Sequence, residues 1–282
     1  MITKTLVLAL LVGTPLFAKE KTGDVVSEAL VKAKSFMAQG QRRQAVLELA
    51  RVADGTKSRK KLLEIENRKT LFAEQFFTSE AFQKYQKAKA LGDVKRWDEC
   101  LRELSAVPAS DQDNLLILRL KMQSHFGLKQ YDAADKTISA VLILLPNDVL
   151  AQFGRVRLLH EQALHADALL TLQKIQPRNS EEIERFAIEK ARILEAQKKT
   201  ADAVEVLRED QTANLDHIEV LYELGMLYRK TPSQAWQARK TLSLFVTRCK
   251  RMSDTELKKK GFEELLPQAQ AALAEIDKQL GV

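Results

Sequence analysis

The sequence predicts an all-α protein, and its composition and hydrophobic spacing carry that prediction. Alanine, leucine, lysine, glutamate and glutamine are abundant among the 282 residues, and all five favour helices. The chain has only 10 glycines and 6 prolines, too few for the many tight turns of a β-rich sandwich or barrel. Apolar residues recur at helical spacing, as at Leu115, Leu118 and Met122. A hydrophobic fraction of 45% and a charged fraction of 29% exclude a collagen-like or wholly disordered chain.

Residues 1–18 have the three-part layout of a secretory signal peptide. Lys4 gives a short positive start, an apolar run follows, and the small residue Ala18 precedes the expected cleavage. The apolar run is too short to cross about 30 Å of hydrocarbon. The alternatives are an uncleaved anchor or a core helix. We expect a periplasmic or exported protein, soluble after cleavage near Ala18, with no integral membrane segment.

A repeat is visible in pairs made of a small residue and, four positions later, a large apolar residue. Successive pairs are separated by 55, 34, 34, 35 and 35 positions. A further small or medium residue recurs twelve positions before the first of each pair, with Gly225 one position out of step. The pairs are Ala45 and Leu49, Cys100 and Leu104, Ala134 and Ile138, Ala168 and Leu172, Ala203 and Leu207, and Ala238 and Leu242.

Each repeat is predicted to be a helical hairpin. A short polar or glycine-containing break lies between its two apolar stripes, and Pro108, Pro146 and Pro177 follow three of the second helices. A single hairpin cannot bury its apolar face, whereas stacked hairpins bury a continuous one. We therefore expect one solenoid domain over residues 19–282. Its repeats are predicted at about residues 25–53, 79–107, 114–146, 148–177, 181–210 and 216–250.

The pattern resembles the tetratricopeptide repeat (TPR) family. Residues 221–228 carry L-G-x2-Y, and the repeat with Tyr131, Ala134, Ile138 and Pro146 carries the second half of the motif. The tryptophan of the motif is absent, because its positions hold Leu118, Gln152 or Leu221. The resemblance covers about residues 25–250 and implies a right-handed superhelix, here in an exported bacterial member.

Two segments depart from the repeat. Residues 58–77 predict an extra long helix, and residues 254–280 predict one amphipathic capping helix with a kink before Pro267. The two cysteines, Cys100 and Cys249, both lie inside helical patterns, so we expect buried thiols rather than a disulfide.

No catalytic set, metal site or cofactor motif is predicted. The four histidines, His125, His160, His165 and His217, lack metal-ligand spacing and are expected at surfaces or turns. An enzyme with a helical toroid would need a catalytic domain, for which the repeats leave no room. The net charge of +7 favours anionic partners only weakly. The basic runs lack interleaved aromatic residues, so nucleic acid is not expected as a partner.

A partner is expected in the concave groove that the first helices line in TPR arrays. Six Lys or Arg side chains and five aromatic ones are assigned there by helical spacing, and two glutamates, Glu195 and Glu219, share the surface. The carboxylate clamp of some TPR cochaperones is not reproduced. The predicted groove comprises Tyr85, Lys89, Arg119, Gln123, Phe153, Arg157, Arg185, Arg192, Tyr222 and Arg229, together with Phe82, Phe126, His160, Ile188 and Met226.

This groove predicts a non-catalytic protein-interaction scaffold of the bacterial cell envelope. Arginine and aromatic side chains suit an acidic or extended segment of an envelope, secretion or appendage protein. One alternative is a binding module for an anionic envelope polymer or membrane surface, and another is that the arginines are ordinary solvated side chains.

Overall fold

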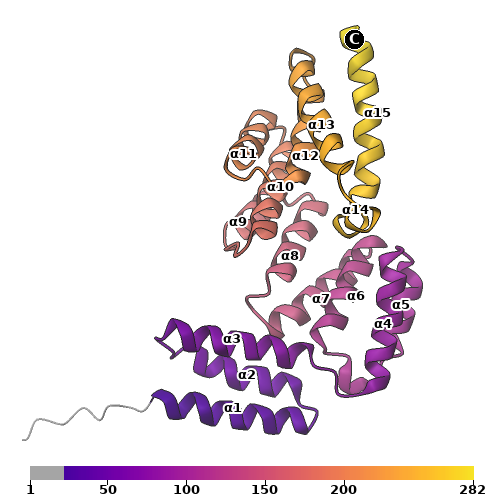
Figure 1. Ribbon diagram of the computed structural model, residues 1–282. Helices are drawn as coiled ribbons and strands as arrows, with labels where there is room; N and C mark the ends of the chain where they lie inside the picture. The colour runs from indigo at the N-terminus through magenta and orange to yellow at the C-terminus, as the bar shows by residue number, and fades with distance from the viewer. Residues whose placement is uncertain (1–21) are drawn as a thin grey trace, which may run out of the picture. The chain divides into compact units, whose positions relative to one another are not determined.

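The computed structural model describes residues 22–282, with side chains from Val25 onward (Figure 1). Fifteen α-helices and two short 3₁₀ helices, and no strand, occur in this part of the chain, which confirms the all-α prediction. None of the helices in it is long and apolar enough to cross a membrane. The predicted signal peptide and its cleavage point near Ala18 lie outside the described residues.

The described chain divides into two compact units, where the sequence predicted a single domain over residues 19–282. The first unit ends at Ala73, and its helices α1 and α2 pack as a hairpin. Each of its three helices contributes a fully buried residue, namely Ala33, Ala45 and Ile65. The helices are α1 (Thr22–Ala38), α2 (Arg42–Ala53) and α3 (Arg59–Glu74).

The second unit, from Glu74 onward, is built from consecutive helix pairs (Figure 1). Four of the five pairs lie within a predicted repeat range, and the α10–α11 pair extends beyond its predicted range of 181–210 at both ends. The pairs are α4 (Ser79–Asp93) with α5 (Trp97–Ser105), α6 (Leu115–Gly127) with α7 (Tyr131–Leu144), α8 (Val149–Glu161) with α9 (His165–Leu172), α10 (Ser180–Ala196) with α11 (Thr200–Ala213), and α12 (Ile218–Arg229) with α13 (Ala235–Cys249). The remaining elements are the 3₁₀ helices η1 (Ala109–Asp111) and η2 (Pro232–Gln234) and the helices α14 (Asp254–Lys260) and α15 (Phe262–Leu280).

The residues that define the sequence repeat are buried in the structure. All six small members of the pairs are 0% exposed, and their apolar partners are at most 1% exposed. At Gly225 an added Cβ would lie 2.6 Å from Cγ of Leu242. Glycine therefore allows α12 and α13 to approach more closely than alanine would. Cys100 and Cys249 are buried free thiols, and burial raises the pKa of the Cys249 thiol to about 11.

Five of the six hairpin turns share one backbone device that the sequence did not reveal. Each has a residue in the left-handed conformation five positions before the buried small residue of its second helix. Only the first of these residues is glycine, so the other four turns hold a side chain in a conformation that costs about 1–2 kcal/mol. The α12–α13 connection instead contains η2. The five residues are Gly40, Lys95, Lys129, Ala163 and Lys198, with φ between 57° and 72°.

The predicted single capping helix is wrong, because residues 254–280 form two helices. Gly261 adopts φ 72° and ends α14, and α15 then begins at Phe262. Pro267 lies inside α15 rather than at a break. The proline removes one backbone donor from the helix, whereas the left-handed glycine changes the direction of the chain.

Candidate binding surface on the first helices of the hairpins

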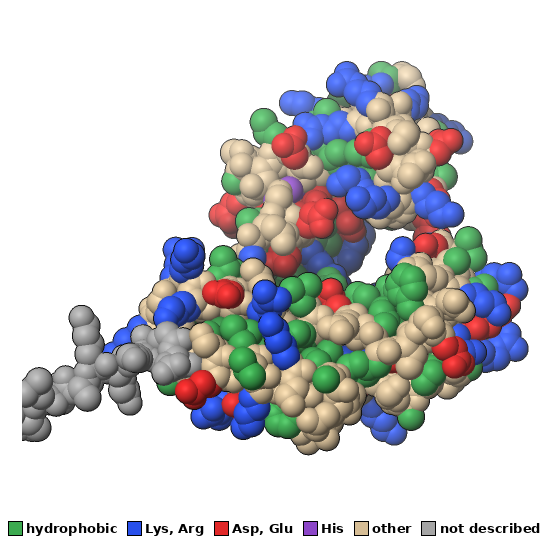
Figure 2. All heavy atoms as spheres, turned by 60° about the horizontal axis from the view of Figure 1, so that its bottom comes forward, with side chains coloured by type: hydrophobic (Ala, Val, Ile, Leu, Met, Phe, Trp, Pro, Cys, Tyr) green, Lys and Arg blue, Asp and Glu red, His purple; other side chains and the backbone are tan. Residues whose placement is uncertain are grey.

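The first helices of three successive hairpins, α8, α10 and α12, carry most of the predicted groove residues. Basic and acidic side chains are interspersed on the face of the molecule drawn in Figure 2 rather than gathered into one basic patch. The environment of each arginine therefore decides whether its charge is available to a partner.

Two of these arginines lie over phenylalanines of the preceding hairpin. The guanidinium carbon of Arg157 is 4.6 Å from the ring centroid of Phe126, and that of Arg185 is 4.8 Å from the centroid of Phe153. Phe126 and Phe153 are 6% and 0% exposed. The two phenylalanines therefore belong to the core, which corrects their assignment to the lining. They order the arginines through cation–π contact instead.

Arg185 has no carboxylate within ion-pair distance among the described residues. Burial lowers the pKa of its guanidinium, and the nearby charge of Arg157 acts in the same direction. The closest carboxylate contact of Arg157, with Glu161, is long at 4.0 Å. A carboxylate that approached Arg185 would offset part of this desolvation, in addition to the more distant charges of Glu189 and Glu219.

Arg192, by contrast, is already neutralised. Its guanidinium lies 2.6 Å from Glu223, 3.2 Å from Glu219 and 3.9 Å from Glu189. Burial raises the pKa of Glu219 within this group. The sequence assigned Arg192 and Glu219 to the groove but did not identify the other two partners of Arg192. Glu189 lies one turn earlier on α10, and Glu223 lies on α12.

His160 lies beside His165, with ring centroids 5.2 Å apart, and the Nδ1 atom of each ring is buried without a hydrogen-bond partner in the described structure. Burial lowers the pKa of His160, and the neighbouring His165 lowers it further. His160 is therefore neutral at pH 7 and adds no positive charge to the surface.

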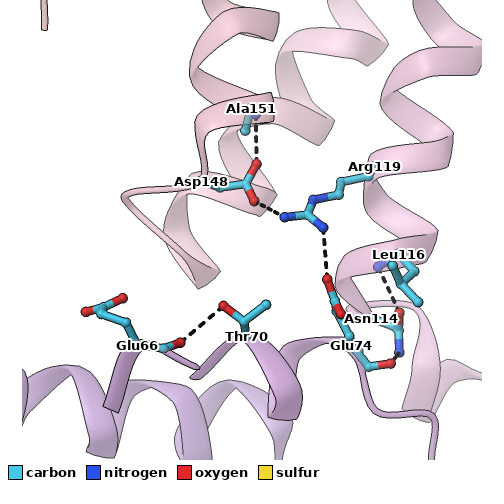
Figure 3. A network of polar contacts seen from close by, with 8 residues as sticks. All are labelled: Glu66, Thr70, Glu74, Asn114, Leu116, Arg119, Asp148 and Ala151. Carbon is cyan, nitrogen blue, oxygen red and sulfur yellow. Dashed lines mark hydrogen bonds and ion pairs between the residues drawn. The ribbon is translucent and has the colours of Figure 1, made fainter. Parts of the chain in front are cut away.

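Arg119 stabilises the fold rather than presenting a free charge. It bridges Glu74 at 2.9 Å and Asp148 at 2.5 Å, as Figure 3 shows. Asp148 also accepts a hydrogen bond from the amide of Ala151 at 2.8 Å and so caps α8. The predicted role of Arg119 in the groove is corrected, because helical spacing could not reveal acidic partners from two other segments.

The α12 end of the predicted groove is covered by α15. The hydroxyl of Tyr222 donates to Oε1 of Gln268 at 2.8 Å, and Arg229 pairs with Glu275 at 2.6 Å. Tyr222 is only 7% exposed. These two residues are therefore contacts within the chain, because the last helix occupies the face that the sequence assigned to a partner.

The remaining predicted residues lie on α4, α6, α10 and α12. Tyr85 is half-buried, with its ring 5.4 Å from Phe76, whereas Gln123 and Lys89 are exposed. Lys89 makes only a long 3.9 Å contact with Asp93. These side chains stay accessible. Ile188 is buried and Met226 is partly buried against the core, so neither forms an exposed lining.

The structure also brings together three residues that the sequence did not connect. His217, expected at a surface or turn, is 2% exposed. Its Nδ1 lies 2.7 Å from Oδ2 of Asp210, and its Nε2 lies 2.8 Å from Oγ of Ser180. No local motif marks these positions, which are 30 and 7 residues apart and meet only when neighbouring hairpins stack.

A scan against known protein families and a search of curated proteins found no match to this chain. The TPR resemblance accordingly rests on the residue pattern of the sequence. Within residues 22–282, no cluster of three or more histidine, cysteine or carboxylate side chains is placed to hold a metal ion.

Proposed function

We propose that the chain is a TPR-like, right-handed superhelical scaffold of the bacterial cell envelope that binds an acidic, extended segment of another protein. The observation that carries the proposal is Arg185, a guanidinium stacked on Phe153 that has no carboxylate within ion-pair distance among the described residues. The export step of the proposal rests on residues 1–18.

Of the predicted groove residues, we propose Arg157 and Arg185 as the main binding residues, with Lys89, Gln123 and Tyr85 as further contacts. A planar guanidinium binds a carboxylate through two parallel hydrogen bonds. Stacking on an aromatic ring restricts the arginine beforehand, so less side-chain entropy is lost on binding. Arg192, Tyr222 and Arg229 are left out because glutamates or α15 already engage them.

The test is a crosslinking pull-down from envelope extract with the mature protein from Lys19 onward. The variant Arg157→Glu/Arg185→Glu is compared with Lys174→Glu/Arg208→Glu, which changes the net charge equally at exposed positions off the site. Circular dichroism verifies that all forms keep their helicity. We expect the native form and the control to capture one partner, and the site variant to bind at least about tenfold more weakly.

Two other outcomes would change the proposal. Equal capture by all three forms would show that α8 and α10 are not the binding surface. Sedimentation of native protein with envelope material at low salt, lost at high salt and without protein capture, would favour the anionic-polymer or membrane-surface function.

A further inference from the structure

Ser180, His217 and Asp210 form a hydrogen-bonded chain whose members come from three segments. Ser180 is the first residue of α10, His217 immediately precedes α12, and Asp210 lies in α11. The Ser180 Oγ to His217 Nε2 distance is 2.8 Å, and the His217 Nδ1 to Asp210 Oδ2 distance is 2.7 Å. His217 and Asp210 are buried, whereas Ser180 is exposed to solvent.

The partners of the imidazole fix its tautomer. An ionised carboxylate only accepts hydrogen bonds, so Nδ1 of His217 carries the proton donated to Asp210. The Nε2 atom is then free to accept the hydroxyl proton of Ser180, which is the arrangement of a general base on a nucleophile. The second carboxylate oxygen of Asp210 accepts from Nδ2 of Asn214 at 3.2 Å, which holds the carboxylate in place.

Backbone donors lie beside the serine. The amides of Ser180 and Glu181 belong to the first turn of a 17-residue helix, where amides have no intrahelical carbonyl acceptor. The side chain of Asn179 accepts from the next amide, that of Glu182, at 2.9 Å. These two amides lie at the positive end of α10, and such donors can stabilise a negative oxygen that forms near Ser180.

We propose that Ser180 and His217 are catalytic residues, positioned by Asp210, for hydrolysis of a carboxylic ester. Oγ of Ser180 attacks the carbonyl carbon while its proton moves to Nε2 of His217. The C–O bond to the leaving group breaks, and the alcohol departs with that proton. Water then releases the acid from the acyl-serine by the same proton relay and restores the hydroxyl.

The charge around the serine selects the substrate class. Glu181, Glu182 and Glu184 lie in the first turns of α10, and Oε1 of Glu184 accepts the amide of Glu219 at 2.8 Å. These carboxylates disfavour an anionic substrate, so we expect an ester with an uncharged acyl group. The exposed serine suits a small or surface-presented ester rather than a substrate that must be enclosed.

This activity goes beyond the proposed binding function and uses different residues. Either proposal can be disproved without the other, because Arg157 and Arg185 do not belong to the hydrogen-bonded group of Ser180, His217 and Asp210. A rival explanation is that the three residues only fasten the segment before α12 to the start of α10. The two explanations differ in what they predict for the reactivity of Ser180.

The first experiment treats the purified protein with a fluorophosphonate probe and with p-nitrophenyl acetate. We expect labelling at Ser180 and ester hydrolysis above that of the Ser180→Ala variant. Both are expected to fall at least about 100-fold in Ser180→Ala and in Asp210→Asn. Ser105→Ala is the matched control, since this exposed serine donates its hydroxyl proton to the carbonyl of Leu101 and has no imidazole beside it. Absence of labelling, or equal rates in Ser180→Ala and the native protein, would overturn the proposal.

A second measurement separates catalysis from folding. In Ser180→Cys the imidazole should activate the new thiol, so iodoacetamide should alkylate it faster than in Ser180→Cys/Asp210→Asn at matched melting temperature. The native Cys100 and Cys249 are buried and react slowly, and they set the background. Equal alkylation rates in the two variants would show that the hydrogen bonds among Ser180, His217 and Asp210 have only a structural role.

Discussion

The two ends of the predicted groove received the same assignment from the sequence and have different structures. On α8 and α10, Arg157 and Arg185 lie over buried phenylalanines, and the closest carboxylate contact of the two is the 4.0 Å approach of Arg157 to Glu161. On α12, Tyr222 and Arg229 are engaged by α15. The comparison teaches that helical spacing identifies which face a side chain occupies, whereas the next element in space decides whether that face is open.

The cover over α12 is part of the core, and Phe262→Ala should show the largest effect. Phe262 is 3% exposed and its ring lies 5.6 Å from Phe245, so its loss should cost about 3–5 kcal/mol. Urea unfolding monitored by circular dichroism measures this cost. Phe82→Ala, at a position 47% exposed, is the control and should cost far less. A cost for Phe262→Ala as small as that of the control would mean that α15 is not part of the core.

The α12–α13 crossing should be intolerant of one methyl group. Gly225→Ala would place Cβ within 2.6 Å of Leu242, and overpacking should cost about 1–3 kcal/mol. Gly55→Ala is the matched control, because nothing lies within 4 Å of its added Cβ. Thermal and urea unfolding compare the two variants. A neutral Gly225→Ala would show that the helices can separate without loss.

The α8–α9 turn and the α12–α13 connection should respond differently to a substitution by glycine. Ala163 has φ 58°, so Ala163→Gly relieves strain and should stabilise the protein by about 0.5–1 kcal/mol. Ser233 lies in η2, and Ser233→Gly should bring no gain. The urea midpoint of each variant, compared with that of the native protein, measures its effect on stability. Destabilisation by Ala163→Gly would contradict the left-handed turn.

The smallest expected difference compares one arginine from each end of the groove. Arg185→Ala removes a cation–π contact and should cost about 0.5–1 kcal/mol. Arg229→Ala breaks an ion pair with the 65%-exposed Glu275 and should cost about 0–0.5 kcal/mol, less at high salt. Urea unfolding at two salt concentrations checks the comparison. A larger and salt-dependent cost for Arg185→Ala would point to an acidic partner within the chain.

The helical hairpins could be predicted because the repeated residues are those that pack between the two helices of a hairpin. Ala134 and Ile138 were singled out by spacing alone, and both are fully buried. The candidate surface was less predictable. Phe153 was assigned to the lining by its helical position, but it is buried beneath Arg185 of the next hairpin. The sequence around Phe153 does not show that a side chain of the next hairpin covers its ring.

The sequence by itself determined the helical class and the period of the small buried residues. Both follow from contacts within a helix or between adjacent helices, where residues a few positions apart must share a face. Only the tertiary structure decided that α15 covers α12, that Arg119 joins Glu74 to Asp148, and that Ser180, His217 and Asp210 meet. Such contacts depend on how successive hairpins stack, and the spacing of residues along one helix does not determine that geometry.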